Sequence, residues 1–202
     1  MKRVVCLASS IVMLFTVCFS FAYAKDFSDV DSTHWAYQYI NELSDGGVIN
    51  GYQDGSFKPS GTITRGEFLK LVVACCMPKN IDLSDAEGKM DHWAANYVWI
   101  AETYGVLGIN EININNINEP ITRIEMARLV SKADMIMRGS SSQYTTELEF
   151  MDVALLNMEN IYLLRHAVGR GLIKGYDDGT FKPDKTMTRA EAATMIYRLS
   201  KI

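Results

Sequence analysis

Internal repetition is the feature that most constrains the fold of this chain, because one short motif occurs three times along it. The motif reads ITRGE at 63–67, ITRIE at 121–125 and MTRAE at 187–191. A longer shared segment precedes the first and third copies, FSDVDSTHWAYQYINELSDGGVINGYQDGSFKP at 27–59 and FMDVALLNMENIYLLRHAVGRGLIKGYDDGTFKP at 150–183. Such a repeat is one supersecondary unit that buries its apolar face only against neighbouring copies. The sequence therefore predicts three similar units that share a core.

The middle unit departs from this pattern but keeps its spacing. It begins LSDAEGKMDHWAANYVWIAETYGVLG at 83–108 and continues as INEININNINEP, where the other units have a Gly-Tyr pair and an Asp-Gly-x-Phe-x-Pro segment. The segment from Ile109 to the threonine of the second motif is as long as the segment from Gly51 to the threonine of the first. We therefore expect the middle unit to share the architecture of the others, with a loop of different chemistry.

Within each unit, the pattern predicts a helix, a loop and a second helix. Trp35, Tyr39 and Leu43 recur at intervals of four on one helical face, and glycines follow them. In the shared motif, threonine followed three residues later by glutamate is a capping box that begins the second helix. The second helices then carry one apolar stripe each, formed by Phe68, Leu71, Val72 and Cys75, by Met126, Leu129, Val130 and Ala133, and by Ala192, Met195, Ile196 and Leu199.

Three units that are each too small for a core of their own would most economically pack these apolar stripes together. We therefore predict an all-α fold of three helix–loop–helix repeats, arranged as a pseudo-threefold unit around a central three-helix bundle. The domain boundaries follow from the repeats, with repeat 1 at 25–77, repeat 2 at 83–137, a linker at 138–149 and repeat 3 at 150–202.

The segment 1–24 has the order of a secretory signal peptide. Lys2 and Arg3 form a basic start, an apolar run extends to Phe21, and Ala22-Tyr23-Ala24 follows as a small-x-small cleavage site. A membrane anchor is the alternative, but the short apolar run and the lack of a basic cluster after it argue against an anchor. Cleavage would remove two positive charges and no negative ones, which changes the formal net charge from −4 to −6. The mature chain is therefore predicted to be secreted and mildly acidic.

This composition excludes several classes of protein. A mildly acidic chain lacks the basic surface that nucleic-acid binding requires, and no second apolar stretch is long enough to span a bilayer. Cys75 and Cys76 alone remain after cleavage, so the chain is not a disulfide scaffold. The sequence lacks His-Glu-x-x-His and Gly-x-Ser-x-Gly motifs, and its Asp-Gly turns lack the glutamate of a calcium loop. We therefore predict no enzymatic activity, no cofactor and no metal site.

The order of motifs resembles the S-layer homology domain. The matching order is F-x-D-V, then Trp, then G-[VL]-I-x-G-Y-x-D-G-x-F-x-P, then [IM]-T-R-x-E, repeated from Phe27 to Ile202. The resemblance implies non-covalent attachment at the bacterial cell wall or S-layer, through a cell-wall polysaccharide that often carries ketal-linked pyruvate. It also implies a pseudo-trimer of repeats with binding grooves between neighbouring units.

The resemblance singles out the arginine of the shared motif, which is Arg65, Arg123 or Arg189. This arginine occupies the first helical position, where the helix dipole disfavours a cation by roughly 0.3–1 kcal/mol. A guanidinium beside the backbone amides of a helix N-terminus would form an anion site that suits the carboxylate of pyruvate. Alternatively, each arginine bridges to an aspartate of its own unit, namely Asp29, Asp85 or Asp152. An arginine held in this way would be a prepared anion receptor, so these aspartates are candidate binding residues too.

Aromatic side chains and the Gly-Tyr pairs complete the candidate site. Trp35 and Trp93 suit the faces of sugar rings, with core packing at a helix start as the alternative reading. The resemblance adds the loop residues Gly51, Tyr52, Gly175 and Tyr176. The first unit matches the whole pattern, the second keeps the tryptophan and arginine, and the third keeps the loop and arginine, with Met158 or Glu159 at the place of the tryptophan. We therefore expect at most two working grooves.

Two functions of different classes are consistent with these features. The first is a surface-anchoring module that holds cell-wall polysaccharide, and the second is a structural or assembly protein that binds other surface-layer proteins rather than sugar. An anchor normally holds a cargo domain, and the sequence stops at Ile202. We therefore expect a freestanding occupant of wall sites, a subunit of a larger assembly or a truncated product.

Overall fold

The computed structural model describes residues 26–78, 80–82, 90–139 and 146–201. Over these residues the fold is all-α, as predicted, and no helix among them is long and apolar enough to cross a membrane. The predicted signal peptide lies outside the described residues, and so does Asp85. The described helices are α1 (Tyr37–Asp45), α2 (Arg65–Cys76), α3 (Ala95–Thr103), α4 (Arg123–Arg138), α5 (Met158–Gly169) and α6 (Arg189–Ser200).

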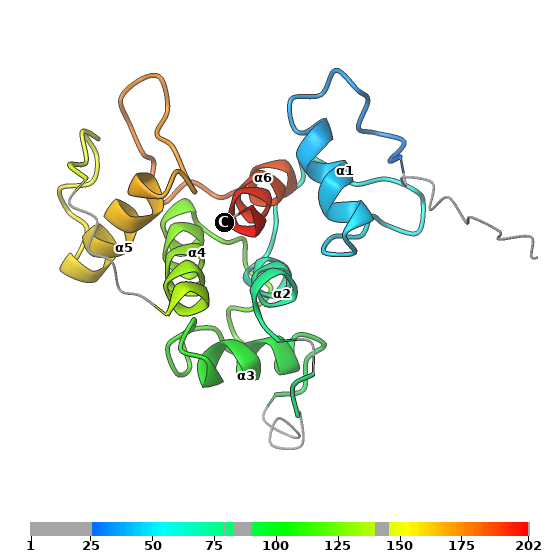
Figure 1. The fold of residues 1–202 in the computed structure, drawn as a ribbon, viewed down its shortest axis with the longest axis horizontal. Helices are drawn as coiled ribbons and strands as arrows, with labels where there is room; N and C mark the ends of the chain where they lie inside the picture. The colour runs from blue at the N-terminus through cyan, green and yellow to red at the C-terminus, as the bar shows by residue number, and fades with distance from the viewer. Residues whose placement is uncertain (1–25, 79, 83–89, 140–145, 202) are drawn as a thin grey trace, which may run out of the picture.

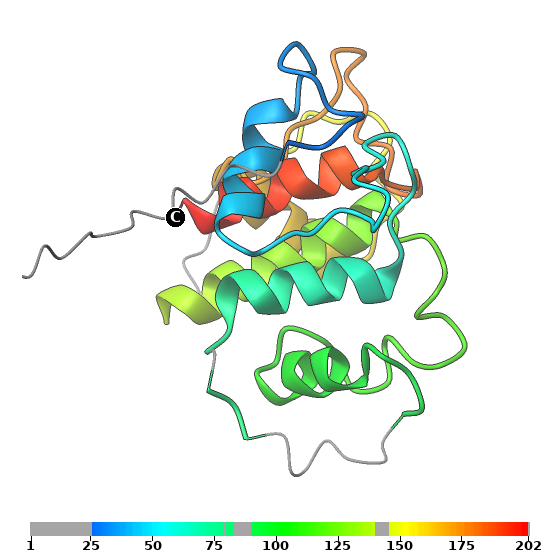
Figure 2. The same ribbon diagram turned by 90° about the vertical axis from the view of Figure 1, so that its right-hand side faces the viewer.

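Three of these helices occupy the centre of the molecule, and the other three lie outside them (Figure 1). The central helices α2, α4 and α6 contact one another in pairs. Figure 2 shows them running side by side in the same direction. The second helices of the three repeats therefore share one core, as predicted, while a threefold symmetry relation between the repeats stays a prediction.

Each outer helix packs against a central helix that belongs to a different repeat. Helix α1 packs on α6, α3 packs on α2, and α5 packs on α4. Among the described helices, no repeat packs its own two helices together. The apolar stripe of each central helix is thus covered by chain from a neighbouring repeat, so the three repeats depend on one another for their core.

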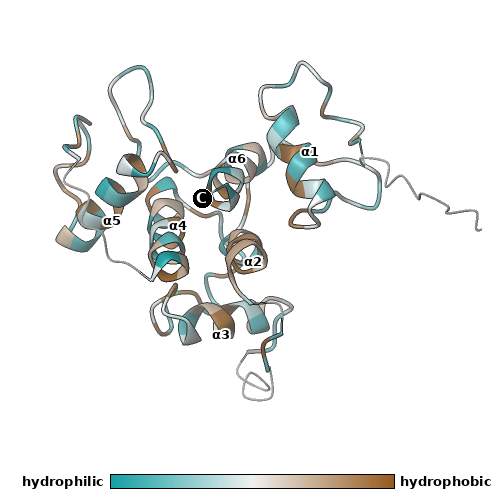
Figure 3. Cartoon of the chain, in the orientation of Figure 1, coloured by the Kyte–Doolittle hydropathy of each residue, from teal (hydrophilic) through white to brown (hydrophobic). Residues whose placement is uncertain are grey.

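The predicted apolar stripes are largely buried between these helices. Phe68, Met126 and Ala192, which share one position, have no exposed surface. Helix α2 is coloured toward the hydrophobic end along most of its length in Figure 3. Leu71 and Cys75 of this helix are only half-buried, which differs from their core placement in the prediction. Leu71 is half-buried because it borders a groove, as described below.

A closed cycle of backbone hydrogen bonds joins the segments that lead into the three central helices. Ile63 donates to the carbonyl of Met187 at 3.1 Å, Met187 donates to Ile121 at 3.1 Å, and Ile121 donates to Ile63 at 3.0 Å. All three side chains are buried. Buried backbone groups need hydrogen-bond partners, and this cycle supplies them while it fixes the starts of α2, α4 and α6 next to one another.

Candidate binding grooves

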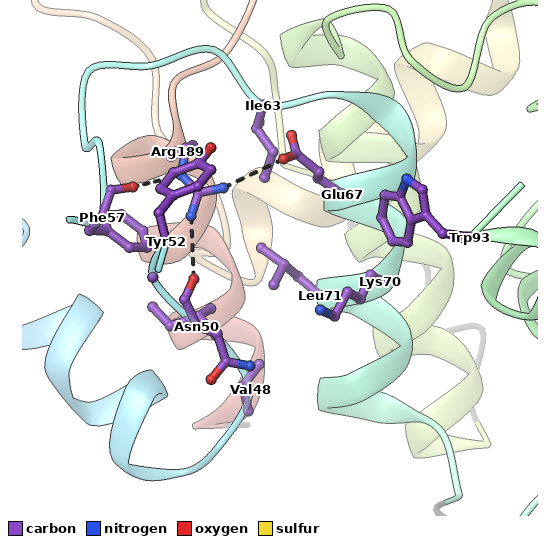
Figure 4. Close-up of a pocket in the computed structure, with 12 residues that line it drawn as sticks. Val48, Asn50, Tyr52, Phe57, Ile63, Glu67, Lys70, Leu71, Trp93 and Arg189 are labelled. Atoms are coloured by element: carbon purple, nitrogen blue, oxygen red, sulfur yellow. Dashed lines mark hydrogen bonds and ion pairs between the residues drawn. The ribbon is translucent and has the colours of Figure 1, made fainter. Parts of the chain in front are cut away.

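One groove, called groove A here, is formed by side chains from all three repeats (Figure 4). It has a volume of about 220 Å³. The loop after α1 contributes Tyr52, α2 contributes Glu67, the segment before α3 contributes Trp93, and α6 contributes Arg189. The remaining lining residues are Val48, Ile49, Asn50, Gly51, Phe57, Ile63, Lys70 and Leu71.

Arg189 is held in groove A by carbonyl oxygens and aromatic rings. Its Nε donates to the carbonyl of Phe57 at 2.8 Å, and Nη2 donates to that of Asn50 at 3.5 Å. The guanidinium carbon lies 4.9 Å from the centre of the Tyr52 ring. Among the described residues, the one carboxylate within ion-pair distance of it is that of Glu67, with Oε1 3.7 Å from Nη1. The guanidinium is therefore well positioned but only loosely paired in charge.

A second groove, groove B, repeats this arrangement with residues from other positions in the three repeats. It has a volume of about 160 Å³. Trp35 comes from the first repeat and Arg123 from the second, while Lys174 and Glu191 come from the third. The other lining residues are Leu172, Ile173, Met187, Thr194, Met195 and Arg198. Groove A thus combines the loop and glutamate of repeat 1 with the arginine of repeat 3 and the tryptophan of repeat 2. Groove B combines the loop and glutamate of repeat 3 with the arginine of repeat 2 and the tryptophan of repeat 1.

Arg123 is the more deeply buried of the two groove arginines, with 7% of its surface exposed. It donates through Nη2 to the carbonyl of Lys174, and its guanidinium lies 4.5 Å from the centre of the Tyr176 ring. Its Nε has no hydrogen-bond partner among the described residues. Burial lowers the pKa of Arg123, the nearby Tyr176 and Glu191 oppose this, and Arg198 lowers it further. Groove B therefore holds a desolvated cation with unused hydrogen-bonding capacity.

Arg65, the third motif arginine, has a different environment. Its Nη1 lies 2.6 Å from Oε2 of Glu119, and its Nη2 lies 2.9 Å from Oε1 of Glu125. Burial lowers the pKa of Arg65, but hydrogen bonds to Glu125 and Glu119 outweigh this, and the net shift is upward. Two carboxylates of the chain itself therefore occupy this guanidinium. The expectation of at most two working grooves remains a prediction, and this pairing agrees with it.

The backbone amides that were expected to assist the arginines are already in use. At the start of α6, Arg189 donates its N–H to the carbonyl of Gly61 and Ala190 donates to that of Pro59, while the third amide is capped by Thr188. The starts of α2 and α4 repeat this pattern with other carbonyls. The predicted combination of amides and guanidinium is therefore wrong, and the side chain alone is available to an anion. The arginine stands at the helix start because it reaches into the loop of a neighbouring repeat.

The aspartates of the F-x-D-V motif hold loops and do not pair with the arginines. Asp29 accepts hydrogen bonds from the backbone amides of Phe57 and Lys58, at 2.7 and 2.8 Å. Asp152 accepts from Phe181 and Lys182 in the same way. Lys58 and Lys182 have positive φ angles of 58°, a conformation that such anchoring stabilises. The alternative of an ion pair within one repeat is therefore wrong for Asp29 and Asp152, and Asp85 lies outside the described residues.

The glycines of the Gly-Tyr pairs permit close packing of the loop. A Cβ atom added to Gly51 would clash with the ring of Phe27, and one added to Gly175 would clash with the ring of Phe150. Gly51 also lines groove A. Tyr52 and Tyr176 lie beside the groove arginines, as described above. The glycine of each pair thus lets the loop approach a phenylalanine ring closely, and the tyrosine provides an aromatic support for the guanidinium.

The two tryptophans are exposed, with 59% of Trp35 and 54% of Trp93 accessible. Each lies beside the histidine that precedes it, with ring centres 5.7 Å apart for Trp35 and 5.4 Å for Trp93. The alternative of core packing is therefore wrong, and both indoles border grooves. In the third repeat, Met158 is 85% exposed.

Sequence reasoning missed the role of the glutamate in the shared motif. In each capping box, Oε2 accepts a hydrogen bond from the amide of the cap threonine. The other oxygen, Oε1, faces a cation of the site, which is Arg189 for Glu67, Arg65 for Glu125 and Lys185 for Glu191. A capping glutamate uses only one carboxylate oxygen for the cap, so the T-R-x-E motif itself indicated that the second oxygen could pair with a cation.

Comparison with known proteins agrees with this geometry. A model of the S-layer homology domain matches residues 26–69 and 166–193, and the middle repeat lies outside both matches. The chain is 29% identical to the S-layer protein sap of Bacillus anthracis, over 89% of this chain and 22% of that protein. It is 29% identical to a cellulosome-anchoring protein of Acetivibrio thermocellus, over 74% of this chain and 34% of that protein.

Enzymes are also among its relatives. The chain is 27% identical to an amylopullulanase of Thermoanaerobacterium thermosulfurigenes, over 89% of this chain but only 10% of that protein. The chain spans between 10% and 34% of the length of these three relatives. These relatives have very different names, and each resembles this chain over only one part of its length. Together with the repeated T-R-x-E helix starts, these matches show that the chain carries S-layer homology domains, which are non-catalytic modules that anchor proteins at the bacterial cell surface.

Proposed function

We propose that the chain binds bacterial cell-wall polysaccharide in grooves A and B, and that each groove arginine receives a carboxylate such as that of ketal-linked pyruvate. The observation that carries this proposal is the repeated pairing of an exposed indole with a positioned guanidinium, Trp93 with Arg189 and Trp35 with Arg123. An indole face suits a sugar ring, and a planar guanidinium suits a carboxylate.

Charge supports groove B in particular. A buried arginine without a carboxylate partner costs free energy, because its charge is desolvated without compensation. An anionic ligand at Arg123 would supply that compensation and accept a hydrogen bond from Nε, which has no partner among the described residues. Binding of this kind needs no covalent step, in keeping with an anchoring module.

Two grooves in one chain also favour retention on a polymer. Once one groove holds a repeating polysaccharide, the second groove meets further sugar units at high effective concentration. The combined affinity can then exceed that of either groove by orders of magnitude, provided that the polymer can reach both. Weak single contacts would thus suffice for stable attachment.

The test is a calorimetric titration of residues 25–202 with purified bacterial cell-wall polysaccharide, before and after mild acid removal of its ketal pyruvate. We expect strong binding to the intact polymer and a large loss after the treatment. Unchanged binding after treatment would refute the carboxylate role and leave the tryptophans as the sugar-reading residues.

The second candidate function is assembly with other surface proteins. It is favoured by exposed apolar side chains around the start of α5, where Met151, Leu155 and Met158 are 75%, 101% and 85% exposed. Side chains of this kind are common at protein–protein contacts. A chain that binds no polysaccharide but self-associates in sedimentation experiments would support this candidate over the first.

A further inference from the structure

One residue position is placed identically against all three motif arginines. Each arginine donates its backbone N–H to a carbonyl in the segment that precedes the cap threonine of a neighbouring repeat. The pairs are Arg189 with Gly61 at 2.8 Å, Arg65 with Glu119 at 3.0 Å, and Arg123 with Lys185 at 3.0 Å. The residue whose carbonyl accepts this hydrogen bond is therefore a glycine, a glutamate or a lysine, depending on the repeat. We call the place of this residue in each repeat the gate position.

At the middle repeat, the gate residue neutralises the arginine. The carboxylate of Glu119 extends from the gate position to Arg65, with Oε2 2.6 Å from Nη1. The capping glutamate, Glu125, takes the other end of the guanidinium at 2.9 Å. Glu119 thus supplies from within the chain the group that a ligand carboxylate would supply from outside.

In groove A, the gate residue has no side chain. A Cβ atom built at Gly61 would lie 3.8 Å from Cδ of Arg189, so a side chain at this position would run beside the arginine. The capping glutamate, Glu67, approaches the guanidinium only to 3.7 Å. Arg189 therefore keeps part of its charge available.

In groove B, the gate residue adds a second cation and removes the competing carboxylate. Nζ of Lys185 lies 2.8 Å from Oε1 of Glu191 and 2.8 Å from the hydroxyl of Tyr176. Glu191 is the equivalent of the glutamates that pair with the other two arginines. Because Lys185 holds it, Arg123 has no carboxylate within ion-pair distance in the described part of the chain.

We propose that the gate position decides whether a motif arginine accepts an external carboxylate. Glu119 occupies Arg65 as an internal ligand, so no external carboxylate binds there. Gly61 leaves Arg189 of groove A accessible to a carboxylate, and Lys185 makes groove B the site with the higher affinity. The inference rests on the proposed function, since it assumes that carboxylates bind at these arginines. It goes further by assigning the difference between the grooves to one residue in each.

The experiment measures binding of purified pyruvylated cell-wall polysaccharide by calorimetry for wild type and gate variants. Lys185→Glu should weaken binding by about tenfold or more, because it releases Glu191 to pair with Arg123 and adds a second carboxylate that repels the ligand. Lys201→Glu is the matched control, since Lys201 also pairs with a glutamate at 2.8 Å but at the far end of α6. Glu119→Lys should increase the amount of polymer bound, with Glu147→Lys as its control.

The outcomes separate this inference from the proposed function. If wild type binds no polysaccharide, or binds it equally after removal of pyruvate, the proposed function fails. If wild type requires pyruvate but Lys185→Glu binds like Lys201→Glu, the gate is overturned while the function stands. Equal binding by Glu119→Lys and Glu147→Lys likewise overturns it. Gly61→Glu provides a second loss variant, and thermal unfolding of every variant confirms that it is folded.

Discussion

Nε2 of His166 lies 2.7 Å from Oδ2 of Asp134, and both side chains are 1% exposed between α5 and α4. Arg170 donates to the same oxygen at 3.0 Å, and Arg138 donates to Oδ1 at 2.9 Å. Burial raises the pKa of Asp134, but hydrogen bonds from Arg170, Arg138 and His166 outweigh it and hold the pKa below its usual value. This cluster joins the second and third repeats and lies apart from both grooves.

Asp134→Asn should destabilise the fold by about 3–5 kcal/mol, because it leaves Arg170, Arg138 and the buried His166 without their carboxylate partner. The free energy of unfolding in urea measures this. Arg138→Ala is the control, since Arg138 is the more exposed partner and its loss should cost about 1 kcal/mol or less. Equal losses for the two variants would contradict a central role for the buried carboxylate.

The stability of the fold should fall in acid, because the pKa of Asp134 is lower in the folded chain than in the unfolded chain. The pKa of Asp134 is lowered from its ordinary 3.8 in the folded state. A carboxyl of this kind contributes stability that is fully present above the unfolded pKa and is lost as pH falls through the folded pKa. Urea midpoints should therefore be constant above about pH 5 and fall below about pH 4. Asp134→Asn should flatten this fall, and an unchanged pH profile in the variant would contradict the assignment.

Thr188→Ala should cost about 1 kcal/mol of stability, because its hydroxyl caps the amide of Glu191 at the start of α6. Thr188→Ser keeps the hydroxyl and should stay within a few tenths of a kcal/mol of wild type. Urea unfolding compares the two variants. If both lose the same stability, the methyl group of the threonine matters and the cap does not.

Gly175→Ala should destabilise the chain by about 1–3 kcal/mol, because the new methyl group overlaps the ring of Phe150. Adding Phe150→Leu should recover part of this loss, and a double-mutant cycle measures the coupling. Gly46→Ala is the control, since a Cβ there meets nothing closer than 3.4 Å. Additive effects of the two substitutions would show that the ring is not the obstacle.

The sequence was sufficient to predict the elements that local chemistry determines. The three capping boxes at Thr64, Thr122 and Thr188 are present as read from the T-R-x-E motif. The all-α class and the shared core of second helices followed from one apolar stripe per helix. Both depend on residues close together in the chain, where spacing and hydrogen bonding leave few alternatives.

The cyclic arrangement could not be predicted from the same patterns. Helix α1 packs on α6, yet all three central helices offer similar apolar stripes, so no stripe identifies its partner. The pairing of Arg65 with Glu119 depends on the same long-range arrangement. The middle loop has lost the recognisable motif, and the glutamate became meaningful only once its backbone contact placed it beside an arginine.

Arginine substitutions in groove A test the proposed carboxylate contact directly. Arg189→Ala should lose more affinity for pyruvylated polysaccharide than Arg189→Lys, and Arg189→Lys should still bind more weakly than wild type. Lysine keeps the charge but loses the planar fork that matches a carboxylate, and it also loses the Nε bond that fixes the side chain to Phe57. Calorimetric titration of each folded variant measures these differences.

Arg65→Ala is the matched control for this series, because it removes the same side chain where two carboxylates of the chain already occupy it. Its affinity for the polysaccharide should stay close to that of wild type, although the loss of its ion pairs lowers stability. Binding that falls equally in Arg65→Ala and Arg189→Ala would mean that loss of any motif arginine disturbs the grooves through the fold. Equal binding by wild type, Arg189→Lys and Arg189→Ala would remove Arg189 from the site and leave Arg123 as the only open anion contact proposed for it.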